Sequence, residues 1–220
     1  MRARRPALLG VEPAGPAEPA VVHLNVAPSA VTRVIFLPVT TTNQVRWLVL
    51  AVRVPAEPSR HRVAVWRELR RIGALSLGQG TWTFPDAPVF AGGLERVLEL
   101  AEQGAGEVVV LDAAGRTDRD GERLEALFTA DRQDEWGEFL ADCGKFDAEI
   151  DKEIRTEKFT VAELEEEEQS LDRLRRWHRE LRARDVFGAE AGAEADRQLQ
   201  HCTARLADFT EQVFRALHQM

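Results

Sequence analysis

The pattern of apolar and polar residues divides the chain into two dissimilar parts. Two mostly apolar runs, VRWLVLAVRV at 45–54 and EVVVLDA at 107–113, have the length and β-branched content of buried strands. Between them, RHRVAVWRELRRIG and APVFAGGLERVLELAEQGAG carry apolar residues at helical spacing, and a glycine follows the apolar stripe of each. The stretch ALSLGQGTWTFPD predicts two short strands around a Gly-Gln-Gly turn.

This order of elements, β-α-β-β-α-β, is the ferredoxin-like pattern. Two right-handed crossovers would place the strands in the order 4-1-3-2 across the sheet. Ser59 is the expected N-cap of the first helix. The helical spacing of Val63, Trp66, Leu69 and Ile72 predicts the stripe that faces the sheet.

Beyond the last predicted strand the pattern is helical to the end of the chain. Apolar stripes predict helices over about 121–130, 131–157, 161–185 and 191–218. Long helices joined by short loops pack as an antiparallel bundle. This half of the chain therefore predicts a bundle with its apolar stripes turned inward.

We therefore expect an α+β protein with two folded domains. A ferredoxin-like domain is predicted over 44–114 and a helical bundle domain over 119–220. Residues 1–43 are rich in proline and show no helical period, which is typical of a disordered N-terminal extension.

Composition and charge restrict the classes of function. The 220 residues are 44% hydrophobic and 30% charged, which is typical of a soluble globular protein with a sizeable core. At a net charge of −8, a nucleic-acid surface requires a local concentration of basic side chains. Cys143 and Cys202 form no CxxC pair, so we expect two small buried hydrophobes in a reducing, cytoplasmic compartment. No apolar run approaches the ~20 residues of a membrane span, and no membrane partner is expected.

Arginines gather on and beside the first predicted helix. A guanidinium group donates hydrogen bonds in a planar fork, so an arginine-rich helix face suits phosphate or another oxyanion. A solvated helix face is the structural alternative. The candidate nucleic-acid or oxyanion-binding residues are Arg53, Arg60, Arg67, Arg70 and Arg71, with Arg62 on the same helix.

The segment KFTVAELEEEEQSLDRLRRWHRELRARDVFG, residues 158–188, begins acidic and ends rich in arginine. Thr160 and Glu163 have the spacing of a capping box, and Phe159 and Leu164 have that of a hydrophobic staple. Acidic residues near the start and arginines near the end complement the helix dipole. The final glycine of the segment is a C-terminal signal, so the pattern predicts one helix across most of it.

Carboxylates from two neighbouring helices are expected to converge. Glu149 and Glu153 share one helix face, and the next helix returns antiparallel with more glutamates near its start. Converging carboxylates can hold a hard metal or act as acid and base. The Glu-x-x-His spacing of di-iron bundles is absent here, so we expect no metal. The candidate cleft comprises Glu149, Glu153, Glu163, Glu166, Glu167, Arg173, Arg176, Trp177 and His178.

Two interpretations of this cleft are open. It is either a site for a metal or for acid–base chemistry, or a purely structural set of helix caps and salt bridges to the arginines. We expect Glu153, Glu163 and Glu167 to bond arginines across the helices. Trp177 and His178 would then line the cleft.

Two long segments resemble a known family. These are WLVL…P…SRHRVAVWRELRRIGALSLGQGTWTFPD and EIDKEIRTEKFTVAELEEEEQSLDRLRRWHRELRARDVFGA. Both are similar to the N-terminal domain of the chromate-resistance protein ChrB family, and the resemblance covers about 45–218. The first segment also resembles, more faintly, the PaaX repressor family. The resemblance implies a bacterial regulator that accompanies chromate efflux genes and responds to chromate. Full-length members carry a second, C-terminal domain.

Two classes of function follow. One is a regulatory or sensor protein of chromate resistance that binds DNA or chromate through the arginine-rich helix. The other is an enzyme or a metal- or cofactor-binding protein that uses the carboxylate cleft. No Walker loop, GxSxG, HExxH or GxGxxG motif occurs, so we assign no catalytic residue and no cofactor, and we favour a non-enzymatic role. A homodimer is compatible with either class.

The two classes make different demands on the folded protein. An arginine surface free of salt bridges would favour the regulator. A closed pocket on which Glu153, Glu167 and His178 converge would favour the enzyme.

Overall fold

The computed structural model describes residues 44–218, and the expectations placed on residues 1–43 lie outside that range. Within it, four strands form one antiparallel sheet with the order β2-β3-β1-β4, which confirms the predicted order. The central strand β1 pairs with β3 on one side and with β4 on the other. The strands are β1 (Trp47–Arg53), β2 (Leu75–Gly78), β3 (Thr81–Pro85) and β4 (Glu107–Ala113).

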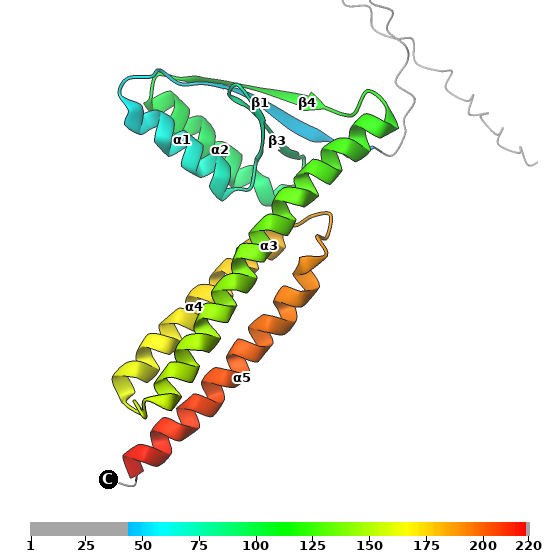
Figure 1. Ribbon diagram of the computed structural model, residues 1–220. Coiled ribbons are helices and arrows are strands. Elements are labelled where there is room, and N and C mark those ends of the chain that lie inside the picture. The colour runs from blue at the N-terminus through cyan, green and yellow to red at the C-terminus, as the bar shows by residue number, and fades with distance from the viewer. Residues whose placement is uncertain (1–43, 219–220) are drawn as a thin grey trace, which may run out of the picture. The chain divides into compact units, whose positions relative to one another are not determined.

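Two helices cover one face of this sheet (Figure 1). They are α1 (Ser59–Arg71) and α2 (Ala91–Gln103), and a short 3-10 turn, η1 (Pro88–Phe90), leads into the second. Their buried side chains share a core with strand residues such as Leu50 and Phe84. The ferredoxin-like pattern of α+β structure is therefore confirmed, and it places α1 beside the sheet with its outer face in solvent.

The buried stripe of α1 differs from the predicted one. Val65, Leu69 and Ile72 are buried, whereas Val63 and Trp66 are 42% and 53% exposed. The prediction that Trp66 faces the sheet is wrong. Leu69 and Ile72 belong to both stripes, and the difference is that Val65 is buried in place of its neighbour Trp66. Adjacent residues lie about 100° apart around a helix, and either residue fits helical spacing. The sheet selects the stripe that can pack, and the indole is left at its edge.

The strand β4 is also less buried than its apolar sequence suggests. Val109 and Leu111 are 44% and 53% exposed, so the prediction of a fully buried second strand is wrong. The reason is its position, because β4 lies at the end of the sheet and only one face of it meets α2. An apolar run alone does not distinguish a central strand from an edge strand.

The second half of the protein is an antiparallel helical bundle. Its helices α3 (Asp118–Arg155), α4 (Val161–Arg184) and α5 (Ala191–His218) lie side by side, and α4 runs opposite to the other two (Figure 1). The prediction of separate helices over 121–130 and 131–157 is wrong, because α3 is one helix of 38 residues. No proline or glycine occurs from 122 to 136, so nothing in the chain breaks it.

The helix ends match the predicted signals in part. Thr160 caps α4 as expected, because its Oγ1 accepts from the backbone N–H of Glu163 at 3.2 Å. The Glu163 carboxylate bonds Lys158 rather than completing the predicted box. A complete capping box occurs instead at Thr117 and Asp120, at the start of α3. The first helix has no side-chain cap, so the expected role of Ser59 is wrong.

A buried ionic network joins the C-terminal end of α1 to the bundle. Arg132 Nη1 donates to the carbonyl of Gly73 at 2.7 Å, and Arg184 Nη1 donates to the carbonyl of Arg71 at 2.7 Å. Glu135 lies between the two arginines, 2.8 Å from Arg132 Nε and 3.1 Å from Arg184 Nε. Gly73 has a φ of +77°, and a Cβ there would lie 2.8 Å from Arg132 Nη1. The network therefore requires glycine at this position.

Candidate functional site

Exposed arginines surround the outer side of α1. Arg53 at the end of β1 and Arg60, Arg62, Arg67 and Arg70 on α1 are all exposed. We call these five residues the arginine face. Within residues 44–218, none of the five forms an ion pair with an acidic side chain. The face therefore keeps its full positive charge toward solvent.

Arg71 behaves differently from the other candidates. Its Nε donates to Glu68 at 2.9 Å, and this hydrogen bond lowers the pKa of Glu68. The same bond raises the pKa of Arg71. Arg71 is thus neutralised locally, and its backbone carbonyl is taken by Arg184. The structure separates it from the unpaired arginines with which the sequence grouped it.

Trp66 stands between two hollows of the surface. On one side lies a hollow of about 740 Å³, lined by Arg53, Arg62 and the backbone around Gly80. On the other side lies a hollow of about 320 Å³ that includes Arg70. The indole is 53% exposed, so an aromatic ring stands in solvent among unpaired guanidinium groups. The sequence prediction missed this exposure because it assigned Trp66 to the stripe that faces the sheet.

The acidic groups around these hollows distinguish them. The larger hollow has Glu107 as its one acidic lining residue. The smaller hollow contains Asp131, Asp134 and Glu135. Burial, and then the charge of Asp134, raises the pKa of Asp131. An anion is therefore better accommodated in the larger hollow, beside Arg53 and Arg62. An arrangement of this kind can hold phosphate groups and stack an aromatic base on the indole.

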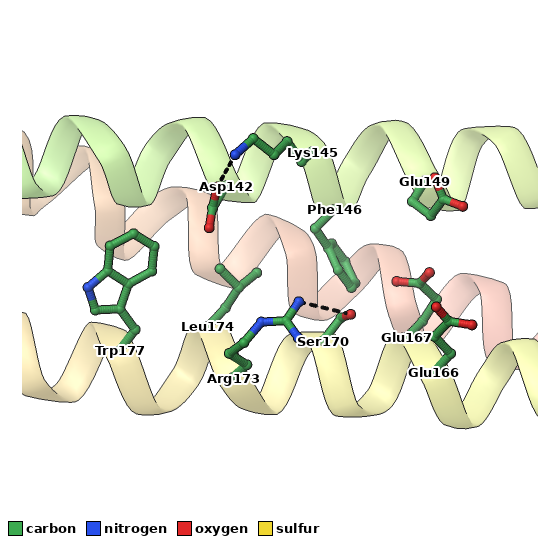
Figure 2. A pocket seen from close by; sticks show the side chains of 10 residues that line it. All are labelled: Asp142, Lys145, Phe146, Glu149, Glu166, Glu167, Ser170, Arg173, Leu174 and Trp177. Atoms are coloured by element: carbon green, nitrogen blue, oxygen red, sulfur yellow. Dashed lines mark hydrogen bonds and ion pairs between the residues drawn. The ribbon is translucent and has the colours of Figure 1, made fainter.

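A cavity of about 340 Å³ lies between α3 and α4, and it contains some of the residues expected in the candidate cleft. Figure 2 shows Glu149, Glu166 and Glu167 gathered at one end, and Trp177 at the other. Arg173 lines the middle and donates to Ser170 Oγ at 3.3 Å. The lining residues are Asp142, Lys145, Phe146, Glu149, Glu166, Glu167, Ser170, Arg173, Leu174 and Trp177.

Glu167 is the most unusual group of this cavity. Glu167 is 4% exposed. Among residues 44–218 its carboxylate has neither a hydrogen-bond partner nor an ion-pair partner. Burial raises the pKa of this carboxyl to about 7, and the charges of Glu149, Glu166, Glu153 and Glu163 act in the same direction. Glu167 therefore titrates near neutral pH.

Glu153 is buried, does not line the cavity and is neutralised by lysines. It is 1% exposed, and Lys158 Nζ lies 3.3 Å from its Oε2 and Lys152 Nζ 3.4 Å from its Oε1. Lys158 also reaches Glu163 at 3.3 Å, and these bonds raise the pKa of the lysine. The expectation that Glu153, Glu163 and Glu167 bond arginines is wrong. The loop after α3 instead places Lys158 between Glu153 and Glu163.

The remaining cleft candidates lie elsewhere. His178 Nε2 is 2.8 Å from Asp196 Oδ1, and its ring packs against Trp136 and Phe139 on the bundle core. It does not line the cavity, so the expectation that it would is wrong. Arg176 is exposed on α4. The structure thus brings together Glu149, Glu166, Glu167, Arg173 and Trp177, while Glu153, Glu163, Arg176 and His178 lie outside.

The described part of the chain offers no prepared metal site and no membrane span. Over residues 44–218, no group of three or more His, Cys, Asp or Glu side chains is placed to hold a metal ion. None of the helices in this range combines the length and the apolar character that crossing a bilayer requires.

These features define a class of protein: an α+β sheet domain with an unpaired arginine face, followed by a helical bundle with an acidic cavity. The family model "Protein ChrB, N-terminal" matches residues 62–220. The chain belongs to this family, which is associated with chromate resistance. The match includes Arg62, Trp66 and Glu167, and it begins after Arg53 and Arg60.

One full-length relative can be aligned over most of the chain. Protein ChrB of Cupriavidus metallidurans (strain ATCC 43123 / DSM 2839 / NBRC 102507 / CH34) is 27% identical over 164 residues. The aligned region covers 73% of this chain and 46% of that protein, so the chain spans about half the length of its relative. No solved structure matches the chain.

Proposed function

We propose that this chain is the DNA-contacting part of a chromate-responsive regulator, and that the arginine face binds the phosphate backbone. The observation that carries the proposal is the set of five exposed arginines that have no acidic partner among residues 44–218, on a protein of net charge −8. On such a protein, unpaired cationic side chains concentrated on the solvent-exposed side of one helix offer a surface suited to a polyanion. Membership of the ChrB N-terminal family supports the link to chromate.

The arrangement favours a polyanion over a single small oxyanion. The arginines run along α1 from Arg60 to Arg70 and include Arg53 on the neighbouring strand. A helix rises about 1.5 Å per residue, so the row extends for roughly 15 Å. One tetrahedral anion occupies a single cluster of donors, whereas successive phosphates of a duplex match a row of this length.

The enzyme alternative has less support. It required Glu153, Glu167 and His178 to converge on a closed pocket, and only Glu167 lines the cavity. His178 is held by Asp196, and Glu153 is neutralised by lysines. A general acid–base pair needs both groups within reach of one substrate.

The proposal is tested by titrating a duplex from the protein's own upstream region at several salt concentrations. Phosphate contacts release counterions, so affinity should fall with salt at a log–log slope of roughly −0.9 per contact. Replacing Arg62, Arg67 and Arg70 with alanine should weaken binding and flatten that slope by roughly 2.7. These residues are exposed and unpaired, so the variant should fold normally, which its circular dichroism and melting temperature would verify.

A matched control carries the same change in charge elsewhere. Arg96, Arg197 and Arg215 are exposed and paired with glutamates on their own helices. Their triple alanine variant should keep most of the wild-type slope. Equal slopes for wild type and the α1 variant, or a wild type that binds no DNA, would refute the proposal.

The response to chromate is tested by repeating the same DNA titration with chromate and with sulfate. Chromate should lower the affinity for the duplex, while sulfate, a tetrahedral dianion of similar shape, should not at equal ionic strength. An equal effect of both anions would mean that ordinary screening explains the change. As a second readout, DNA should protect Trp66, the most exposed described tryptophan, from acrylamide quenching.

A further inference from the structure

The cavity between α3 and α4 contains a charge that nothing in the described protein neutralises. Glu167 is 4% exposed, and no hydrogen bond or ion pair to it occurs within residues 44–218. A buried carboxylate is costly unless a cation or several donors compensate it. Figure 2 shows this side chain at the acidic end of the cavity, beside Glu166 and opposite Glu149.

We propose that this cavity binds a small organic cation, a primary ammonium group on a short apolar chain, with Glu167 as its buried charge partner. The inference is independent of the DNA-binding proposal, which concerns the other end of the protein. An ammonium group has three donors and no acceptor, and three glutamate side chains line this end of the cavity. Glu149 already pairs with Lys152, while Glu166 and Glu167 are available to the ligand.

The rest of the cavity suits the apolar part of such a ligand. Phe146 lines the cavity next to the glutamates, Leu174 lies further along it, and Trp177 stands at the opposite end. An aromatic face attracts a nearby cation, and methylene groups gain by leaving water against such side chains. The volume of about 340 Å³ lies at the lower end of the range for small-molecule sites.

Other ligand classes fit the cavity less well. A divalent metal ion would need at least three converging ligands, and no such group is arranged for metal within residues 44–218. An anion would meet three glutamates at one end of the cavity, where neither of the two cationic lining residues, Lys145 and Arg173, pairs with Glu166 or Glu167 within residues 44–218. Lys145 pairs with Asp142, and Arg173 donates to Ser170.

Binding should be linked to protonation. The charged groups near Glu167 are Glu149 and Glu153 of α3, Glu163 and Glu166 of α4, and the lysines that pair with them. α5 contributes no residue to the cavity lining. The pKa of Glu167 is raised to about 7, so the free protein is part-protonated at neutral pH. A bound cation favours the ionised carboxylate, and protons are therefore released on binding.

The experiment uses putrescine and butylammonium as probes, with the whole chain and without DNA. Isothermal titration at pH 7 and physiological ionic strength, in two buffers of different ionisation enthalpy, should show release of about half a proton per ligand. Affinity should rise between pH 6 and pH 8. Glu167→Gln should weaken binding by roughly tenfold or more and abolish the proton release, because the charge partner is lost.

Glu165→Gln is the matched control. Glu165 lies on α4 two residues away, is exposed and does not line the cavity, so its variant should bind like the wild type. Equal affinity of the Glu167→Gln and wild-type proteins would mean diffuse binding to an acidic surface and would overturn the proposal. The absence of amine binding would also overturn the proposal. So would a result in which Mg²⁺ or Ca²⁺ binds more tightly than either amine and this binding depends on Glu167.

Discussion

Replacing Arg132 with alanine should be among the most destabilising single changes in this protein. Arg132 is 3% exposed, and burial lowers the pKa of its guanidinium. It donates to the carbonyl of Gly73 at 2.7 Å and lies 4.6 Å from the centre of the Phe128 ring. Its Nε is 2.8 Å from Glu135, close enough for ion pairing although the angle is unsuitable for a hydrogen bond.

The magnitude follows from what each group loses. Removal of one partner from a buried ion pair costs about 3–5 kcal/mol. The cost should lie at the lower end, because Glu135 keeps Arg184 at 3.1 Å. The carbonyl of Gly73 would lose a buried donor, which costs about 1–3 kcal/mol and overlaps with the first figure. We therefore expect a loss of about 3 kcal/mol, or roughly 6–12 °C in melting temperature for a chain of this size.

Urea denaturation followed by tryptophan fluorescence measures this loss. Arg96→Ala is the control, because Arg96 forms an exposed ion pair with Glu99 and should contribute about 0.5 kcal/mol or less. A loss below about 1 kcal/mol for Arg132→Ala would show that the network does not hold α1 to the bundle. A marked change in the slope of the transition would instead indicate that the two parts unfold separately.

Three further predictions concern the bundle. Thr160→Ala should lower the free energy of unfolding by about 1 kcal/mol, the usual cost of a lost N-cap. Glu163→Ala should cost less, because the Glu163 carboxylate does not bond the backbone N–H of the cap residue. Urea titration of both variants would compare the two losses. The pKa of Glu167 is raised to about 7 from 4.5, so its ionisation penalises folding increasingly as pH rises from 4.5 through 7. Glu167→Gln should therefore be more stable than the wild type at pH 8.5 by up to about 3 kcal/mol, with the difference vanishing near pH 4.5; a thermal melt series that showed the opposite trend would contradict this sign. Cys143 and Cys202 are fully buried, so a thiol reagent should label them slowly in the native protein and rapidly in urea; fast native labelling would contradict the burial.

The sequence identified elements wherever the signal was local. The strand order followed from the β-α-β-β-α-β pattern, and Thr160 was found from the residues beside it. The orientation of α1 could not be found this way, because either Val65 or Trp66 can extend the apolar stripe of Leu69 and Ile72 at helical spacing. Leu69 was predicted correctly, but only contact with the sheet selects Val65 over Trp66, and the indole becomes a surface residue as a result.

The candidate cleft shows a second limit of sequence reasoning. The structure places Glu149, Glu166 and Glu167, which helical spacing put on facing sides of two helices, around one cavity. Helical spacing did not identify the charge partners of the cleft candidates, because these depend on how a loop returns Lys158 over the end of α3. The pairing of His178 with Asp196 joins two helices and leaves no mark in either segment alone.

Because α3 is continuous and its N-terminal part packs on the sheet, the sheet and the bundle cannot be separated into two independent fragments without exposing aromatic side chains. Near the start of α3, Phe128 packs 5.7 Å from the ring of Trp47, and Phe187 lies 5.8 Å from the same indole. A sheet fragment ending at residue 114 would lose both rings and expose that indole, while the bundle fragment would expose Phe128. Proteolytic nicking between β4 and α3 should therefore leave two pieces that stay associated and co-elute, and hydrogen exchange should protect the sheet core and the first turns of α3 to a similar degree.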